Sequence, residues 1–133
     1  MSQENEEIAR RSIDAFSRGN LDAVIETLAP GFELHPSGRF MDTQRVYRGR
    51  EGWTEFWGDF RAAWEDVAVS IERMEAIDDR VLILGKIHGK GRESGVAVKA
   101  DAAWVHTVND GLIVRVQTFA TWADALEAAG LRE

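Results

Sequence analysis

The sequence predicts an α+β fold in which a curved, mostly antiparallel sheet is wrapped over three helices. Two observations support this prediction. Apolar residues recur with a helical period in three segments before residue 66, and mostly with a period of two after it. Each amphipathic element has one apolar face, so the helices and the sheet bury those faces by stacking. A strongly twisted sheet that curls over helices leaves a cone-shaped hollow, a natural place for a ligand.

Three segments show the helical period. The first, about residues 2–18, carries apolar residues at i, i+4 and i+7 and ends at Gly19. The second follows at once, with Asn20 as its N-cap and Pro30 as its stop. The third contains Gly58, which costs roughly 1 kcal/mol relative to alanine, so packing must stabilise it. Its pattern is the strongest in the chain and consists of Trp53, Phe56, Trp57, Phe60 and Trp64.

The remaining segments predict strands. Residues 32–35 alternate apolar and polar and end at Pro36, after which a polar loop runs to about residue 48. The Asp110-Gly111 pair predicts a hairpin, because both residues tolerate positive φ. A short C-terminal helix is expected to follow Thr121, which begins a pattern typical of a capping box. Four strands are predicted after residue 66, beginning at Val67, Val81, Val96 and Leu112.

Length and composition exclude several classes of protein. With 133 residues the chain is expected to form one domain, residues 1–133. A net charge of −7 would repel a phosphate backbone, so nucleic acid is not an expected partner. The absence of cysteine rules out thiolate catalysis and cysteine-ligated metals, and the three histidines lack metal-ligand spacing. We therefore expect no metal and no cofactor.

The location of the protein is also predicted from what the chain lacks. Its first residues are acidic, where a signal peptide would be basic, and no apolar h-region follows. No apolar run approaches the roughly 18 residues that a membrane span requires. We expect a cytoplasmic protein that does not bind a membrane.

Five short segments give the chain a specific resemblance. They are AFSRGNLDA (15–23), FELHP (32–36), YRGREG (47–52), VNDGLIV (108–114) and ALEAAGL (125–131). Together they resemble the SnoaL-like branch of the nuclear transport factor 2-like superfamily, which includes the ketosteroid isomerases. The resemblance implies a cystatin-like α+β barrel, a single SnoaL-like domain and a homodimer. The fold hosts isomerases, cyclases, dehydratases, epoxide hydrolases and binding proteins, so it does not imply one activity.

The steroid isomerases of the superfamily provide the sharpest comparison. Their general base is an aspartate before a proline, and that position here is His35. The two oxyanion-hole positions align roughly with Ser12 and Ala103. All three residues differ from the isomerase pattern, so steroid isomerisation by that mechanism is not expected. Aromatic residues of the third helix line the pocket in that family, and Phe56 and Trp57 match them.

Two residues are candidates for catalysis. The resemblance places His35 at the cavity, where an imidazole can transfer protons near neutral pH. The alternative is a histidine that hydrogen-bonds a loop carbonyl. Asp101 shares a strand face with Ala103 by the period of two, so it would line the cavity and orient His35 if Ala103 does. Its alternative is a surface pair with Lys99.

The other polar candidates have simpler expected roles. Glu33 shares a face with His35, so both side chains point into the pocket or both point to water. His106 is expected on the outer face of its strand, near a subunit interface. His88 is expected at the surface.

The ligand site is predicted to be aromatic. Trp53 and Trp57 lie near the start of the third helix, which the resemblance places over the cavity mouth. Phe60 and Trp64 are expected to be core. An apolar, flat-walled pocket for a hydrophobic ring compound would be made by Phe16, Tyr47, Trp53, Phe56 and Trp57.

Three functions remain open at this point. The first is an isomerase, cyclase or hydrolase in which His35 transfers a proton and Asp101 assists. The second is a module that binds a hydrophobic small molecule without chemistry. The third is a structural homodimer formed through the convex face of the sheet, with an expected surface of Trp104, His106, Arg115, Gln117 and Phe119.

Overall fold

The computed structural model describes residues 2–36 and 45–131. Four helices are present among them: α1 (Ser2–Ser17), α2 (Leu21–Ile25), α3 (Gly49–Ala63) and α4 (Trp122–Ala128). The strands are β1 (Leu28–His35), β2 (Tyr47–Arg48), β3 (Trp64–Ile77), β4 (Arg80–Gly91), β5 (Ala97–Asn109) and β6 (Leu112–Phe119). The predicted loop between residues 37 and 48 lies mostly outside the described residues, and its last two residues form β2.

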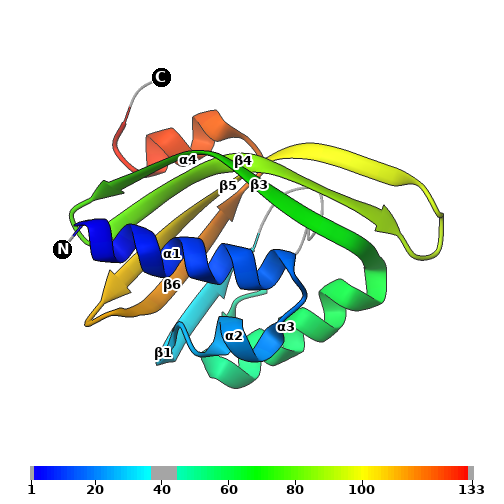
Figure 1. Ribbon diagram of the computed structural model, residues 1–133, viewed down its shortest axis with the longest axis horizontal. Coiled ribbons are helices and arrows are strands. Elements are labelled where there is room, and N and C mark those ends of the chain that lie inside the picture. The colour runs from blue at the N-terminus through cyan, green and yellow to red at the C-terminus, as the bar shows by residue number, and fades with distance from the viewer. Residues whose placement is uncertain (1, 37–44, 132–133) are drawn as a thin grey trace.

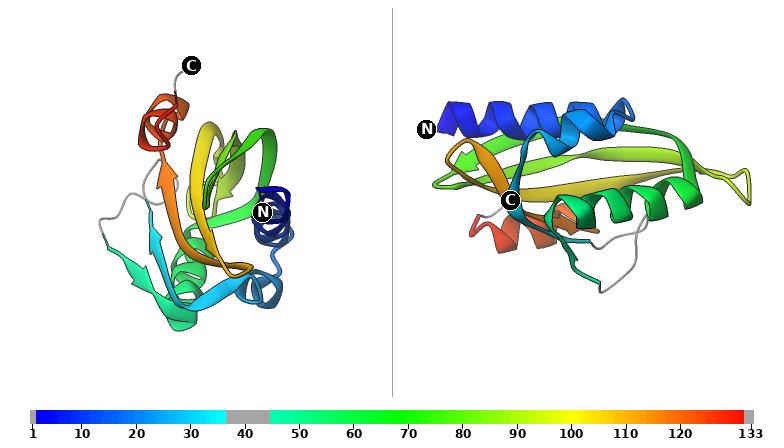
Figure 2. Two further views of the ribbon diagram at one scale, coloured as in Figure 1. Left: turned by 90° about the vertical axis from the view of Figure 1, so that its left-hand side faces the viewer. Right: turned by 90° about the horizontal axis from the view of Figure 1, so that it is seen from below.

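The strands form one six-stranded sheet in the order β2-β1-β6-β5-β4-β3. Only β1 and β6 pair in parallel among these strands, and the other neighbours are antiparallel. The sheet curves around α1 and α3, whereas α4 lies on its other side (Figures 1 and 2). The predicted α+β class, with a curved and mostly antiparallel sheet, is confirmed.

The two faces of the sheet bury two separate hydrophobic clusters. The larger cluster joins α1, α2 and α3 to the concave face and includes Phe32, Trp53 and Trp104. The smaller cluster lies on the convex face, where Leu126 of α4 packs with residues such as Leu84. Strands β4 and β5 are therefore covered on both sides. This double covering decides where several predicted residues lie.

The local signals of the sequence form the structures that were predicted from them. Gly19 ends α1 with a φ of 74°, and the Asn20 side chain accepts a hydrogen bond from the Ala23 amide at the start of α2. Asp110 and Gly111 both adopt positive φ, 51° and 76°, in the β5–β6 hairpin. Thr121 caps α4 by accepting from the Asp124 amide at 3.1 Å.

Two helices end earlier than the apolar period predicts. α2 stops at Ile25, and Leu28 begins β1 because it pairs with Ile113 of β6. α3 stops at Ala63, and Trp64 begins β3 opposite Gly91 of β4. Leu28 is buried and Trp64 is partly buried against the same core cluster, but pairing with a distant strand replaces the last helical turn in both places.

Candidate functional site: an aromatic cavity under α1

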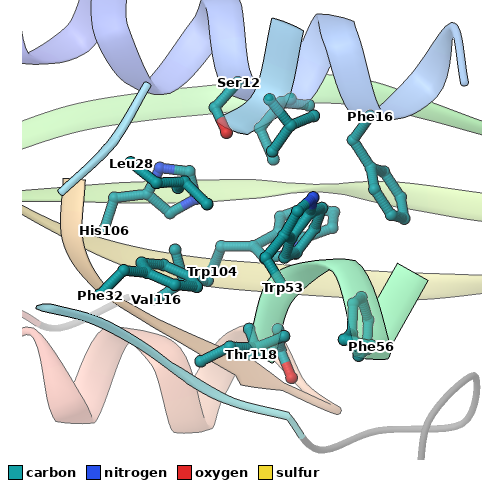
Figure 3. Close-up of a pocket in the computed structure, with 13 residues that line it drawn as sticks. Ser12, Phe16, Leu28, Phe32, Trp53, Phe56, Trp104, His106, Val116 and Thr118 are labelled. Carbon is teal, nitrogen blue, oxygen red and sulfur yellow. The ribbon is translucent and has the colours of Figure 1, made fainter. Parts of the chain in front are cut away.

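A cavity of about 50 Å³ lies between the helices and the concave face of the sheet. Helices α1 and α3 and strands β1, β5 and β6 all contribute to its wall (Figure 3). The wall is mainly apolar. Its residues are Ile13, Phe16, Val24, Leu28, Phe32, Leu34, Trp53, Phe56, Trp104 and Val116, with Ser12, His106 and Thr118 as the polar members.

The volume of the cavity limits what it holds without rearrangement. A space of about 50 Å³ exceeds that of one water, which needs roughly 10–15 Å³, but a dry engineered cavity that binds benzene measures about 150 Å³. A ring compound therefore enters only if side chains of the wall move apart. Aromatic rings turn about two side-chain dihedrals, so such movement does not require the backbone to refold.

Trp53 is at the centre of the aromatic wall. Its ring lies 6.1 Å from Phe16, 6.3 Å from Phe32 and 5.1 Å from Phe56 between ring centroids. The contacts with Phe16 and Phe32 are edge-to-face, an arrangement that the ring quadrupoles favour. These neighbours come from α1, β1 and α3, so the Trp53 ring is held from three elements.

Two buried nitrogen atoms of the cavity wall have no hydrogen-bond partner in the part of the chain that the structure describes. They are Trp53 Nε1 and His106 Nδ1, in side chains that are 7% and 2% exposed. Figure 3 shows both rings among the residues that surround the space under α1. An unpaired buried polar group costs roughly 1–3 kcal/mol, so two of them in one apolar wall need an explanation.

His106 is uncharged at neutral pH in this environment. Complete burial lowers the pKa of its imidazole from 6.5 to about 3, because the charged form loses its hydration. No Asp, Glu, Lys or Arg stands among the described residues that line the cavity. The cavity thus presents hydrogen-bonding groups without charge.

The structure brings three of the five predicted ligand residues to the cavity. Phe16, Trp53 and Phe56 line it, whereas Tyr47 and Trp57 do not. The Tyr47 hydroxyl donates a 3.0 Å hydrogen bond to Asp59 at the outer side of α3. Trp57 is half-buried, packs against Phe16 at 5.9 Å, and stacks under the Arg61 guanidinium.

His35 lies on the outer face of β1. Its Nε2 atom is 3.0 Å from Glu33 Oε1, and Arg48 donates to the other Glu33 oxygen at 2.5 Å. These contacts lower the pKa of Glu33, the hydrogen bond with His35 most strongly. Leu34, between the two residues, points to the cavity. The prediction that Glu33 and His35 share a face is confirmed, and the expectation that His35 faces the cavity is wrong.

Asp101 also lies away from the cavity. Its carboxylate pairs with Lys86 of the neighbouring strand β4, rather than with Lys99 or His35. Ala103 packs against α4 in the convex cluster, so the face that Asp101 shares with it is the convex one. The premise that Ala103 faces the cavity is wrong, and His35 and Asp101 do not form a pair.

His106 and Trp104 are the residues that the sequence reasoning misplaced. Both were expected on the convex face, and both line the cavity. They alternate with Ala103 and Val105, which face α4. The size of Trp104 was the available signal. Neighbouring residues of a strand point to opposite faces, so the tryptophan marks the face with more room and Ala103 beside it marks the more crowded one. The expected dimer surface therefore combines residues of two different faces.

A family model described as a SnoaL-like domain matches residues 9–116. No curated protein matches. Among the described residues no helix has the length and apolar character to cross a membrane, and no group of three or more His, Cys, Asp or Glu side chains is arranged to hold a metal ion.

Several solved structures share the fold. An NTF2-like protein of unknown function from Burkholderia pseudomallei has a TM-score of 0.79 at 19% identity, covering 93% of this chain and 95% of that one. A putative polyketide cyclase from Xanthomonas campestris has a TM-score of 0.79 at 19% identity, over 96% and 98%. TerC co-crystallised with polyporic acid has a TM-score of 0.76 at 17% identity, over 96% and 98%.

Proposed function

The chain belongs to the SnoaL-like domain family, and from this premise we propose that it binds a small, uncharged, ring-containing molecule in the cavity under α1. The wall supports this proposal because it combines five aromatic rings with aliphatic side chains and only three polar ones. Apolar clefts with a few polar groups are the usual form of small-molecule sites. Fold neighbours described as a putative polyketide cyclase and as a protein co-crystallised with polyporic acid support a small-molecule ligand.

The observation that carries the proposal is the absence of charged side chains from the described part of the wall. A charged ligand would lose its hydration on entering and would find no opposite charge in compensation. An uncharged ring compound gains roughly 25 cal/mol per Å² of apolar surface that it buries. The cavity thus favours uncharged ligands over ions of similar shape.

Binding without chemistry fits this geometry better than proton transfer. Among the described residues of the wall, His106 is the side chain that could titrate, and its pKa of about 3 makes it a weak base at neutral pH. Catalysis by His35 and Asp101, as an isomerase, cyclase or hydrolase, stays a prediction. Both residues would act at surfaces that do not border the cavity.

Titration with α-methylstyrene, an uncharged aromatic hydrocarbon, tests the proposed function. Isothermal titration calorimetry is expected to show saturable binding to the wild-type chain. Ser12→Leu adds apolar volume at a buried position of the wall, so it is expected to weaken binding about tenfold, which corresponds to ~1.4 kcal/mol. His35→Ala is the matched control, and its dissociation constant is expected to stay within about twofold of wild type.

Three results would contradict the proposal. Absence of saturable binding of α-methylstyrene, and of uncharged ring ketones of similar size, would reject a ligand site in the cavity. Equal affinity for wild type and for a folded Ser12→Leu variant would place the bound molecule elsewhere. A strong loss of affinity in His35→Ala would show that the molecule binds at the outer face of β1 instead. Circular dichroism of each variant verifies folding.

The predicted homodimer rests on the family resemblance. With Trp104 and His106 in the cavity, the convex residues left for contact are Arg115, Gln117 and Phe119. We propose that two copies meet there, and sedimentation equilibrium at micromolar concentration is expected to give twice the mass of one chain. A mass of 14.9 kDa, that of the single chain, would reject the dimer.

A further inference from the structure

We infer that the ligand of the cavity carries a carbonyl-type oxygen, which accepts a hydrogen bond from Trp53 Nε1, and a second polar atom, which pairs with His106 Nδ1. This inference rests on the proposed function and adds the chemical class of the ligand. It follows from the two unpaired nitrogens of an otherwise apolar wall.

The indole of Trp53 can only donate. Its N–H is buried without an acceptor among the described residues, and its ring packs against the apolar rings of Phe16, Phe32 and Phe56, which offer none. The hydroxyl-bearing residues of the wall, Ser12 and Thr118, do not reach this atom. A ligand in the cavity can supply the acceptor, and one that does so removes the cost of the unpaired donor.

The imidazole of His106 is more permissive. As an uncharged ring it has one N–H and one lone pair, so Nδ1 donates in one tautomer and accepts in the other. A hydroxyl group satisfies either tautomer because it both donates and accepts. The most complementary ligand is thus a hydroxylated ring ketone.

Water is the competing occupant of the same positions. A water molecule that reaches either nitrogen can pair with it, and a ligand that displaces such a water must reproduce its hydrogen bond to gain affinity. A pure hydrocarbon would leave both nitrogens unpaired. The two classes of ligand should consequently respond differently to removal of the Trp53 N–H.

The test compares matched aromatic probes of similar size. α-Methylstyrene has no polar atom, acetophenone replaces its methylene by a carbonyl oxygen, and benzoate carries a charge. The meta and para hydroxyacetophenones add the second polar atom. Dissociation constants are measured by calorimetry for wild type, Trp53→Phe and His106→Leu. Trp122→Phe is the control, because the indole N–H of Trp122 in α4 already donates a hydrogen bond to the Gly85 carbonyl of β4.

The informative quantity is the ratio of the affinities for acetophenone and for α-methylstyrene, compared between chains. The ketone loses more hydration on binding than the hydrocarbon, and this difference is the same for every chain. Trp53→Phe is expected to lower this ratio about tenfold, whereas Trp122→Phe leaves it unchanged. His106→Leu is expected to remove the gain of the better hydroxyacetophenone isomer over acetophenone. Benzoate is expected not to bind to any of the chains.

A second measurement does not depend on the folding of a variant. In the ¹⁵N–¹H spectrum of the wild-type chain, acetophenone should shift the Trp53 indole N–H downfield, and α-methylstyrene should not. If the hydrocarbon binds but the ratio and the resonance do not respond to the carbonyl, this inference is overturned and the proposed function stands. If none of the uncharged probes binds, both are overturned.

Discussion

Gly85→Ala is expected to lower the free energy of unfolding by about 3 kcal/mol, the upper part of the range for overpacked sites. A Cβ atom at this position would overlap the Ser70 carbonyl oxygen and lie 3.2 Å from its carbonyl carbon and 3.3 Å from Ile71 Cα. These are backbone atoms of the paired strand β3, so no side chain can turn aside. The two strands would have to separate in the middle of the sheet.

Alanine at position 85 is expected to disturb more of the structure than the β3–β4 pair. Its carbonyl accepts a 3.0 Å hydrogen bond from Trp122 of α4, so a displaced β4 strand also disturbs the convex cluster. A register irregularity between Ile71 and Arg73 follows directly in β3. Irregularities of this kind bend a strand and raise its twist, and the close approach at Gly85 belongs to that bend.

Urea denaturation followed by circular dichroism measures the effect, with Gly58→Ala as the matched control. Gly58 is exposed in α3 and has nothing within 4 Å of an added Cβ, so alanine there is expected to raise stability by about 0.5–1 kcal/mol. A Gly85→Ala chain as stable as wild type would show that the β3 backbone moves aside without a loss of stability. A destabilised Gly58→Ala chain would show that the exposed side of α3 does not accommodate an added methyl group.

The helices and turns were predictable because each has a local cause. Gly19, Asn20 and Thr121 act through hydrogen bonds and dihedral angles within a few residues. Asp110 and Gly111 likewise determine their hairpin without help from the rest of the chain. Features that depend on distant pairing, such as the end of α3 at Ala63, were missed for the opposite reason.

The orientation of β5 was not predictable from its own pattern. Residues 102–106 are all buried, because the helices cover one face of the strand and α4 covers the other. Polarity then gives no alternation, and an error of one residue moves every side chain to the opposite face. This is how Asp101 was placed at the cavity and His106 outside it.

Strand β1 shows the converse case. Phe32 and Leu34 alternate with Glu33 and His35, and burying the apolar pair predicts the orientation that the structure has. The family resemblance suggested the reverse by matching His35 to a catalytic aspartate. Where a resemblance and the polarity of a half-buried strand disagree, the cost of burying a carboxylate decides in favour of polarity.

The buried histidine gives the second large effect, a loss of stability in mild acid. The pKa of His106 is about 3 in the folded chain, because burial disfavours its charged form, and about 6.5 when unfolded. The unfolded chain therefore binds a proton that the folded chain does not between these values, and acid favours unfolding. Stability from this source is complete above pH ~6.5 and falls as the pH drops through the window toward ~3.

From pH 8 to pH 5 this term is expected to remove about 2 kcal/mol. This loss of stability depends little on the exact pKa of His106 in the folded chain. For any folded-state pKa well below 5, the folded imidazole is still uncharged at pH 5. His106→Leu cannot titrate, so its urea midpoint should fall less over the same interval. The exposed pairs of Glu33 and Glu55, whose pKa values are also lowered by their partners, remain in both chains and cancel in the comparison. Parallel pH dependence of the two chains would mean that His106 takes up its proton at the same pH in the folded and the unfolded chain, and the cavity would then hold a charge at pH 5.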